Sequence, residues 1–331
     1  MSYNTSDHSD TNYSDTILPP PLDMKVFSST ERTYVVVWYC LVSTLSLLLH
    51  LTFILGARKL CGWRSNFSFT LLLALSVVSC VRFTAQLIAS IAEMFYVNWG
   101  YSRILSVALG SFVCAPYFTV VVLNIAIALH RLAYTTFPIT ASSFLGGYVA
   151  KSILAAIVLF FVACVSFFNS ELMGAYWYEE TLSWTSVEGD YEDLFMMINR
   201  VSNYSVGILN FVVYTLLVFV LFRKKILSFH RNEEVRMTLQ VFCMALLEIL
   251  FFIYWEFADS SGFVTWDIMI AETSNLLFFD VLVAPYLIFN GRIHAELKRL
   301  VKRNVTQVAA IVIPDSRGTK LYNGNQKESK I

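Results

Sequence analysis

The feature that most constrains this chain is a series of apolar stretches, each long enough to cross a lipid bilayer as a helix. About 20 helical residues span the roughly 30 Å hydrocarbon core. Of the 331 residues, 56% are hydrophobic and only 15% are charged, whereas soluble domains carry about 25% charged residues. The required length is reached at 34–57, 67–92, 104–130, 147–168, 201–222, 237–257 and 266–289. We therefore predict an all-α membrane protein, a bundle of seven transmembrane helices.

Both ends of the chain are polar. Residues 1–33 are rich in Ser, Thr, Asp and Asn, which is typical of a disordered tail. Asn4 and Asn12 each begin a glycosylation triplet, usable if this end is extracellular. Within 291–304, apolar and basic residues take opposite helix faces, which predicts a short amphipathic helix on the inner leaflet. Residues 305–331 are again expected to be disordered.

The distribution of basic residues predicts the orientation, because Lys and Arg are favoured in cytoplasmic segments. If the N-terminus is outside, 19 of the 24 Lys and Arg residues fall in cytoplasmic segments and 4 in outer segments. We therefore expect a multi-pass protein of the plasma membrane, with its N-terminus extracellular and its C-terminus cytoplasmic. The formal net charge is zero, which gives no reason to expect binding to nucleic acid.

Two short motifs stand at the ends of predicted spans. The third span runs into Arg131, and Pro138 follows seven residues later. Alone, such an arginine is explained by a boundary charge that snorkels to water. The seventh span ends in the run Ala-Pro-Tyr-Leu-Ile-Phe-Asn, residues 284–290. Its proline, Pro285, removes one helix hydrogen bond and predicts a kink or hinge.

Together these motifs resemble the rhodopsin-like G-protein-coupled receptors, which close helix 3 with an Asp-Arg-Tyr type motif and a proline seven residues further on. His130-Arg131 before Phe137-Pro138 is similar to the divergent variant found in nematode chemosensory serpentine receptors, and a sensory cilium would suit such a receptor. The resemblance implies that Arg131 is restrained until helix 6 moves outward and a heterotrimeric G protein binds. His130 replaces the usual acid, which implies a weaker restraint.

The resemblance, together with the ionisable residues inside the predicted spans, indicates three groups of functional residues. The group for coupling and activation is His130, Arg131, Tyr134, Pro138, Arg223, Lys224, Lys225 and Pro285. The ligand-facing group is Cys114, Tyr117, Phe118, Phe252, Trp255 and Glu272. The buried ionic group is Arg82, Glu248 and Asp280. A charge at mid-membrane costs at least about 2.5–3.5 kcal/mol unless it is paired. Glu248 and Asp280 are both candidate partners for Arg82. We favour Asp280 because helix 7 usually neighbours helix 2 in such receptors.

The chain departs from those receptors in ways that narrow its expected function. The loop 169–200 contains no cysteine and Ser106 stands at the helix 3 position, so their outer disulfide is not expected. The cysteines are interpreted as small core residues. Val113 replaces the acid of amine receptors, and 266–289 lacks the lysine of an opsin.

The preferred function is a chemosensory receptor that binds a small, apolar or weakly polar molecule in the outer half of the bundle. A peptide receptor on the same plan stays open, because the loop 169–200 is acidic and suits a cationic peptide. A seven-helix transporter or channel is the third alternative, although no internal repeat of the kind common in transporters is evident. No catalytic or metal-binding motif is found, so neither an enzyme nor a cofactor is expected.

Overall fold

The computed structural model describes the backbone of residues 27–96, 99, 103–170, 173–187, 190–223, 232–257 and 264–312, and the side chains of these residues except 232–239, 241, 264–265 and 303–312. In chain order the helices are α1 (Ser29–Ala57), α2 (Phe67–Met94), α3 (Arg103–Thr136), α4 (Pro138–Phe144), α5 (Gly147–Phe168), α6 (Glu192–Tyr204), the π-helix η1 (Ser205–Leu209), α7 (Asn210–Arg223), α8 (Asn232–Phe257), α9 (Val264–Val281), α10 (Ala284–Phe289) and α11 (Gly291–Val312). The glycosylation triplets at Asn4 and Asn12 lie outside the described residues.

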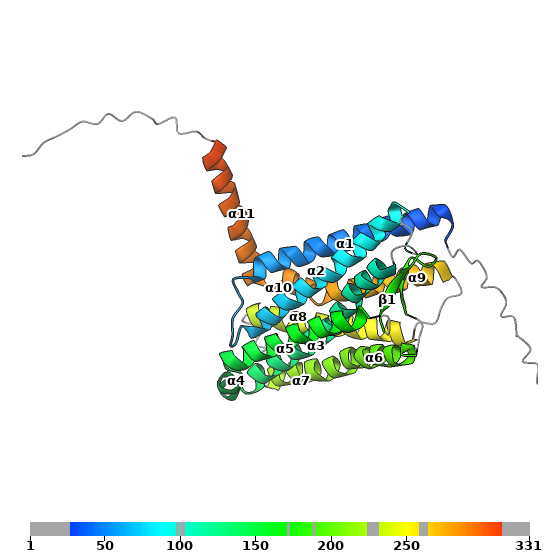
Figure 1. Cartoon of the computed structure of the whole chain (residues 1–331). Coiled ribbons are helices and arrows are strands. Elements are labelled where there is room, and N and C mark those ends of the chain that lie inside the picture. The colour runs from blue at the N-terminus through cyan, green and yellow to red at the C-terminus, as the bar shows by residue number, and fades with distance from the viewer. Residues whose placement is uncertain are drawn as a thin grey trace, which may run out of the picture.

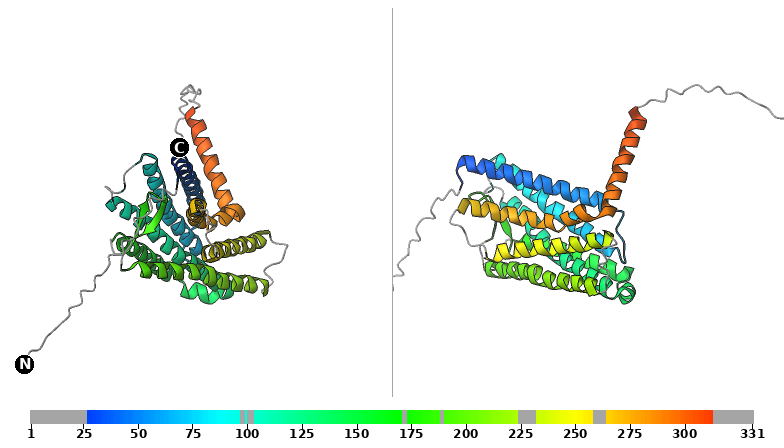
Figure 2. Two further views of the ribbon diagram at one scale, coloured as in Figure 1. Left: turned by 90° about the vertical axis from the view of Figure 1, so that its right-hand side faces the viewer. Right: turned by 180° about the vertical axis from the view of Figure 1, so that it is seen from behind.

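The long helices lie side by side along one common direction (Figure 1). One end of the bundle carries a β-hairpin formed by β1 (Ala175–Tyr178) and β2 (Ser183–Ser186), and is called the hairpin end below. The opposite end carries α4 and is called the α4 end. Helix α3 packs against α2, α5 and α7, while α1 packs against α2 and α9. Helix α11 leaves the α4 end at a steep angle to the bundle (Figures 1 and 2).

Among the described residues, six helices are long and apolar enough to cross a membrane. They are Ser29–Ala57, Phe67–Met94, Arg103–Thr136, Gly147–Phe168, Glu192–Arg223 and Trp266–Phe289. Each contains or overlaps one of the predicted spans, and the remaining span, 237–257, lies within α8. The helical, membrane-type architecture predicted from the sequence is therefore confirmed, and it is compatible with a multi-pass membrane protein.

The outer surface of the bundle is apolar, as α1 illustrates. The exposed fraction lies between 47% and 59% for its outward-facing leucines, Leu41, Leu45, Leu48, Leu51 and Leu55. These positions share one helix face. The opposite face buries Ser43, Ser46 and His50 against other helices. Soluble proteins rarely expose such a continuous apolar stripe, whereas a helix in contact with lipid requires one.

Several element boundaries differ from the predicted ones. Helix α1 begins at Ser29 rather than at 34, because Ser28 and Glu31 form a capping box at its start. Helix α11 continues to Val312, beyond the predicted end at 304, and no glycine or proline interrupts the sequence between its first residue and Pro314. The final helix is therefore not short. The β-hairpin was not predicted at all.

Candidate functional site

Arg82 is the centre of a buried ionic contact midway along α2. Its Nη1 atom donates a hydrogen bond of 2.9 Å to the main-chain oxygen of Val113 on α3, and its Nη2 atom lies 3.9 Å from Oε1 of Glu272 on α9. The guanidinium carbon lies 4.9 Å from the ring centroid of Phe279. The Arg82 and Glu272 side chains are each 6% exposed. This contact therefore joins α2, α3 and α9 inside the bundle.

The expected pairing of Arg82 with Asp280 is wrong. Asp280 instead accepts a hydrogen bond of 2.6 Å from Ser46 of α1, and His50 Nε2 lies 3.4 Å from its other oxygen. Glu272 and Asp280 stand eight residues apart on α9, which corresponds to roughly 12 Å along a helix. Depths counted from the edges of apolar stretches could not resolve that difference.

Three of the predicted ligand-facing residues gather around Arg82. Glu272 pairs with its guanidinium, Cys114 directly follows Val113, whose main-chain oxygen accepts from Arg82, and Tyr117 stands about one helical turn further along α3. The Tyr117 hydroxyl also donates a hydrogen bond to Asn203 of α6. The phenol of Tyr39, on α1, is fully buried and has no hydrogen-bond partner among the described residues. Sequence reasoning missed Tyr39, because nothing in an apolar span marks one tyrosine as facing the interior.

Two other predicted ligand-facing residues serve packing between helices. The Phe118 ring stacks on that of Phe168 from α5, with centroids 5.3 Å apart. Phe252 of α8 lies against Gly207 in η1, so closely that a Cβ atom at Gly207 would overlap its ring. The glycine explains how α8 approaches the π-helical turn.

A cavity of about 440 Å³ opens between α6 and α8 at the hairpin end. Its walls include Asn203 and Trp255. Asn203 is the partner of Tyr117, and Trp255 donates a hydrogen bond of 3.0 Å to Ser274 on α9. The cavity is therefore connected, through two hydrogen bonds, to the elements that hold the Arg82–Glu272 pair. Its size falls within the range of about 300–1,000 Å³ that is usual for small-molecule sites.

Glu248 on α8 bridges two neighbouring helices. One carboxylate oxygen accepts a hydrogen bond of 3.0 Å from Asn124 of α3, and the other accepts one of 3.0 Å from Asn210 of α7. All three residues are 1% exposed. Neither asparagine was predicted, because an isolated amide in a span gives no sign of its partner. The bridge fixes α8 against both α3 and α7.

Arg131 lies over the ring of Tyr286, with 4.8 Å between its guanidinium carbon and the ring centroid. Its Nη1 atom is buried without a hydrogen-bond partner among the described residues. Tyr286 directly follows Pro285, and α9 ends at Val281, the residue four positions before that proline. A proline cannot donate to that carbonyl and clashes with it, so the predicted break is present. The two motifs found in the sequence thus meet in space.

The remaining residues predicted for coupling lie at the α4 end. His130 Nε2 lies 3.2 Å from the main-chain oxygen of Arg64, and its ring centroid is 4.6 Å from that of Tyr134. Pro138 is the first residue of α4, and Arg223, the last of α7, is exposed. Lys224 and Lys225 lie outside the described residues.

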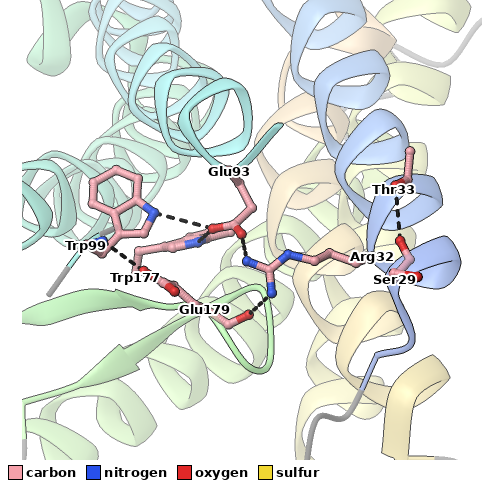
Figure 3. Close-up of polar contacts among 7 residues, drawn as sticks. All are labelled: Ser29, Arg32, Thr33, Glu93, Trp99, Trp177 and Glu179. Atoms are coloured by element: carbon pink, nitrogen blue, oxygen red, sulfur yellow. Dashed lines mark hydrogen bonds and ion pairs between the residues drawn. The ribbon is translucent and has the colours of Figure 1, made fainter. Parts of the chain in front are cut away.

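A second polar cluster closes the hairpin end (Figure 3). The Glu93 carboxylate, on α2, pairs with Arg32 of α1 and accepts indole hydrogen bonds from Trp177 at 2.9 Å and Trp99 at 3.3 Å. Glu179 accepts from the Trp99 main-chain nitrogen at 2.8 Å, and its own main-chain oxygen accepts from Arg32 at 3.3 Å. We call these five residues the Glu93 cluster.

Further contacts attach the hairpin to α2 and α3. The Trp177 main-chain nitrogen donates to Ser106 at 2.8 Å, and the Trp184 indole donates to Gln86 at 2.6 Å. Gly110 permits the carbonyl of Ala175 to approach α3, because a Cβ atom there would overlap that oxygen. All six cysteines are free. Hydrogen bonds therefore hold the hairpin against the bundle.

The start of α11 is attached to the end of α1. Glu296 lies 3.2 Å from Nζ of Lys59 and also contacts Arg299. The hydrogen bond from Lys59 lowers the pKa of the Glu296 carboxyl, and Arg299 adds to this effect. A Cβ atom at Gly56 would lie 2.6 Å from the Ile293 side chain, so the glycine allows close packing.

The fold and its buried polar contacts define the class of the protein as a membrane-type helical bundle with ionisable groups paired inside it. No protein-family model and no curated protein sequence matches the chain. A fold does not by itself imply a function, which depends on the residues at its sites.

Proposed function

We propose that the chain is a seven-helix receptor of the G-protein-coupled type, with α8 as the further membrane-crossing helix. It binds a small molecule toward the hairpin end and engages a heterotrimeric G protein at the α4 end. The excess of basic residues in the segments at the α4 end supports placing that end in the cytoplasm and the hairpin end outside the cell. The motif around Arg131 favours a chemosensory receptor of the plasma membrane.

The observation that carries the proposal is that buried polar contacts lie at three successive depths of one bundle. The first is the Arg82–Glu272 pair, the second is the Glu248 bridge, and the third is Arg131 over Tyr286. Leaving a polar group without a partner inside a membrane protein is costly. Movement at one depth therefore changes which arrangement is stable at the next, as coupling between two distant sites requires.

The Glu248 bridge points to α8 as the helix that moves on activation. Outward movement of α8 separates Glu248 from Asn124 and Asn210, so the bridge favours the inward position of α8. The α9–α10 break lies beside Tyr286 and supplies a hinge at the ring that covers Arg131. A ligand that prefers the outward position shifts the equilibrium toward the state that binds the G protein.

The Glu93 cluster favours a small molecule over a cationic peptide as the ligand. Glu93 is paired with Arg32 and accepts two indole groups, and Glu179 accepts from Trp99. Two of the acidic groups at the hairpin end are thus already engaged within the chain. A peptide that used them would have to displace these partners.

The test is guanine-nucleotide exchange on purified heterotrimeric G proteins, with the full chain in lipid nanodiscs. We expect exchange above that of the G protein alone, lost in Arg131→Ala and retained in Arg103→Ala. Arg103 is an exposed residue at the opposite end of α3 and serves as the matched control. Exchange that is indifferent to Arg131→Ala, or no exchange with any major class of G protein, would contradict the proposal.

A further inference from the structure

We propose that the cavity between α6 and α8 binds a small zwitterion with an apolar side group, such as a free amino acid or a dipeptide. The inference deepens the proposed function and rests on it for any signalling consequence. Binding itself is a property of the cavity and can be measured without a G protein.

The charges that line the cavity have both signs. Arg200 and Asp193 lie on α6, and Glu256 lies on α8. Neither Arg200 nor Asp193 forms an ion pair with a described residue, and Glu256 accepts a hydrogen bond of 2.7 Å from Tyr204. One cation and two anions therefore line one partly enclosed space, with the arginine and the aspartate unpaired there.

The mixture of signs selects the charge type of the ligand. A simple anion attracted by Arg200 would also face Asp193 and Glu256, and a simple cation attracted by the acids would face Arg200. Opposite charges near a protein surface attract and like charges repel. A ligand that carries both signs satisfies both kinds of residue and avoids the repulsion.

The spacing of the charges fits a short zwitterion. Asp193 and Arg200 stand seven residues apart on one face of α6, which is roughly 10 Å along the helix. Contacts of up to about 4 Å at each charge reduce the length that the ligand itself must span, and Glu256 offers a second acceptor from the facing helix. An extended chain covers about 3.3–3.6 Å per residue, so the ends of an amino acid or a dipeptide can bridge the remaining distance.

The same cavity offers an apolar surface. Met196 and Met197 line it from α6, and Trp255 lines it from α8. Methionine side chains are flexible and polarisable, so they adapt to apolar groups of different shape and favour aromatic ones. An aromatic or branched aliphatic side group is therefore the best match for this part of the wall.

Two wall residues connect the cavity to the buried ionic contact. Asn203 accepts the hydroxyl hydrogen bond of Tyr117, and Tyr117 stands about one helical turn after Val113, whose main-chain oxygen accepts from Arg82. Trp255 donates to Ser274, which stands two residues after Glu272 on α9. A ligand that competes for Asn203 or moves Trp255 therefore changes the surroundings of the Arg82–Glu272 pair.

The first experiment measures binding of four probes to the full chain in nanodiscs by isothermal titration. The zwitterions are L-phenylalanine and glycyl-L-phenylalanine, while phenethylamine lacks the carboxylate and 3-phenylpropionate lacks the ammonium group. We expect at least one zwitterion to bind at least about tenfold more tightly than both single-charge probes. Equal binding of either single-charge probe, or no zwitterion binding up to about 10 mM, overturns the inference.

The second experiment assigns the charges. Arg200→Gln should weaken zwitterion binding by at least about tenfold, and leave phenethylamine unaffected or improved. Glu256→Gln should weaken the zwitterion and leave 3-phenylpropionate unaffected or improved. Arg103→Gln, at an exposed arginine away from the cavity, is the control, and thermal melting shows that each variant is folded. Arginine and glutamate variants that bind all probes like the parent overturn the site.

Nucleotide exchange separates this inference from the proposed function. Zwitterion binding that depends on Arg200 without any effect on a G protein supports the site and contradicts the receptor function. Exchange that depends on Arg131 but is not changed by any zwitterion supports the receptor function and overturns the ligand class.

Discussion

Arg32 and Glu93 form an ion pair that joins the first turn of α1 to the last turn of α2, at the point where the β-hairpin meets the bundle (Figure 3). The Glu93 side chain is 1% exposed, whereas that of Arg32 is 27% exposed. A buried carboxylate is tolerated only when it is paired and its oxygens accept hydrogen bonds. Here Arg32 supplies the pair and two indole groups donate the hydrogen bonds. One carboxylate thus holds α1, α2, the hairpin and Trp99 together.

Replacing Glu93 with glutamine should lower the stability of the protein. The amide cannot pair with Arg32 and offers only one oxygen to two indole donors. A broken buried pair typically costs about 3–5 kcal/mol, and because Arg32 is 27% exposed we expect a loss of about 2–4 kcal/mol. Thermal melting of the purified chain measures the loss. In the Arg32→Met background the same change should cost less, because the ion pair is already absent. Equal costs in both backgrounds would show that the pair is not coupled.

Adding a methyl group at Gly207 or Gly110 should destabilise the protein, because the methyl group would overlap a side chain at the first position and backbone at the second. Gly207→Ala places a Cβ atom 2.9 Å from the Cβ atom of Phe252 and in conflict with its ring, whereas Gly110→Ala meets the carbonyl of Ala175. Overpacking typically costs about 1–3 kcal/mol. Gly207→Ala should cost less in thermal melting when it is made in the Phe252→Ala background, because alanine lacks the Cγ atom and the ring that meet the added methyl group. No side-chain truncation should rescue the second, because the obstacle there is backbone.

Removing the Glu248 carboxylate should raise basal nucleotide exchange. Glu248→Leu abolishes hydrogen bonds to Asn124 and Asn210, and such bonds between membrane helices average about 0.6 kcal/mol each. Their joint loss changes the equilibrium between the inward and outward positions of α8 by about fivefold to tenfold in favour of the outward one. Glu248→Gln retains one acceptor and should show a smaller rise. A leucine variant with the basal rate of the parent would refute the role of the bridge.

Replacing His130 with aspartate should lower basal exchange. The adjacent Arg131 has no ion pair with a described residue and lies over Tyr286. A permanent negative charge beside it would favour the restrained state. His130→Asn, which also removes the imidazole but adds no charge, should leave the basal rate higher than the aspartate variant does. Indistinguishable rates for the two variants would mean that charge at this position does not restrain Arg131.

The attachment of α11 should weaken in acid. The pKa of Glu296 is lowered from 4.5 by its hydrogen bond from Lys59. A lowered pKa means that the contribution to docking is complete above the ordinary value and is lost as the pH falls through the lowered one. Hydrogen exchange at residues 293–299, corrected for its intrinsic pH dependence, should therefore accelerate below about pH 4.5. Lys59→Met should show fast exchange already at neutral pH.

The parts of the fold that local sequence encodes were predicted, and the parts that depend on helix rotation were not. The length of each apolar stretch decides whether a helix can span lipid, so most of the helices were found. Pro285 acts on its own preceding turn, so the break before it was found too. The partner of Arg82 depends on how α2 and α9 are rotated and shifted relative to each other. The sequence of neither helix alone can therefore decide between Glu272 and Asp280.

The site shows the same division. Arg131 was identified by its position at the end of a span, but its contact with Tyr286 brings together residues far apart in the sequence. The hairpin was missed because β1 and β2 are short and rich in polar and aromatic residues, and their anchoring depends on Glu93, which is 84 residues from Trp177. In the sequence, Glu93 looks like any other charged residue at the end of an apolar stretch, so nothing marks it as the partner of Trp177.

The two faces of α1 have a consequence for how this helix finds its place. Leucine is as soluble in lipid as in a protein interior, so the leucine stripe does not favour one rotation of the helix about its axis over another. The rotation of α1 is set instead by polar contacts, with Ser46 bonded to Asp280 and Trp38 to Thr273 of α9. Exchanging the leucines for other aliphatic residues leaves the rotation of α1 about its axis unchanged. Moving Ser46 by a single position, in contrast, rotates the face of α1 that meets α9 by about 100°.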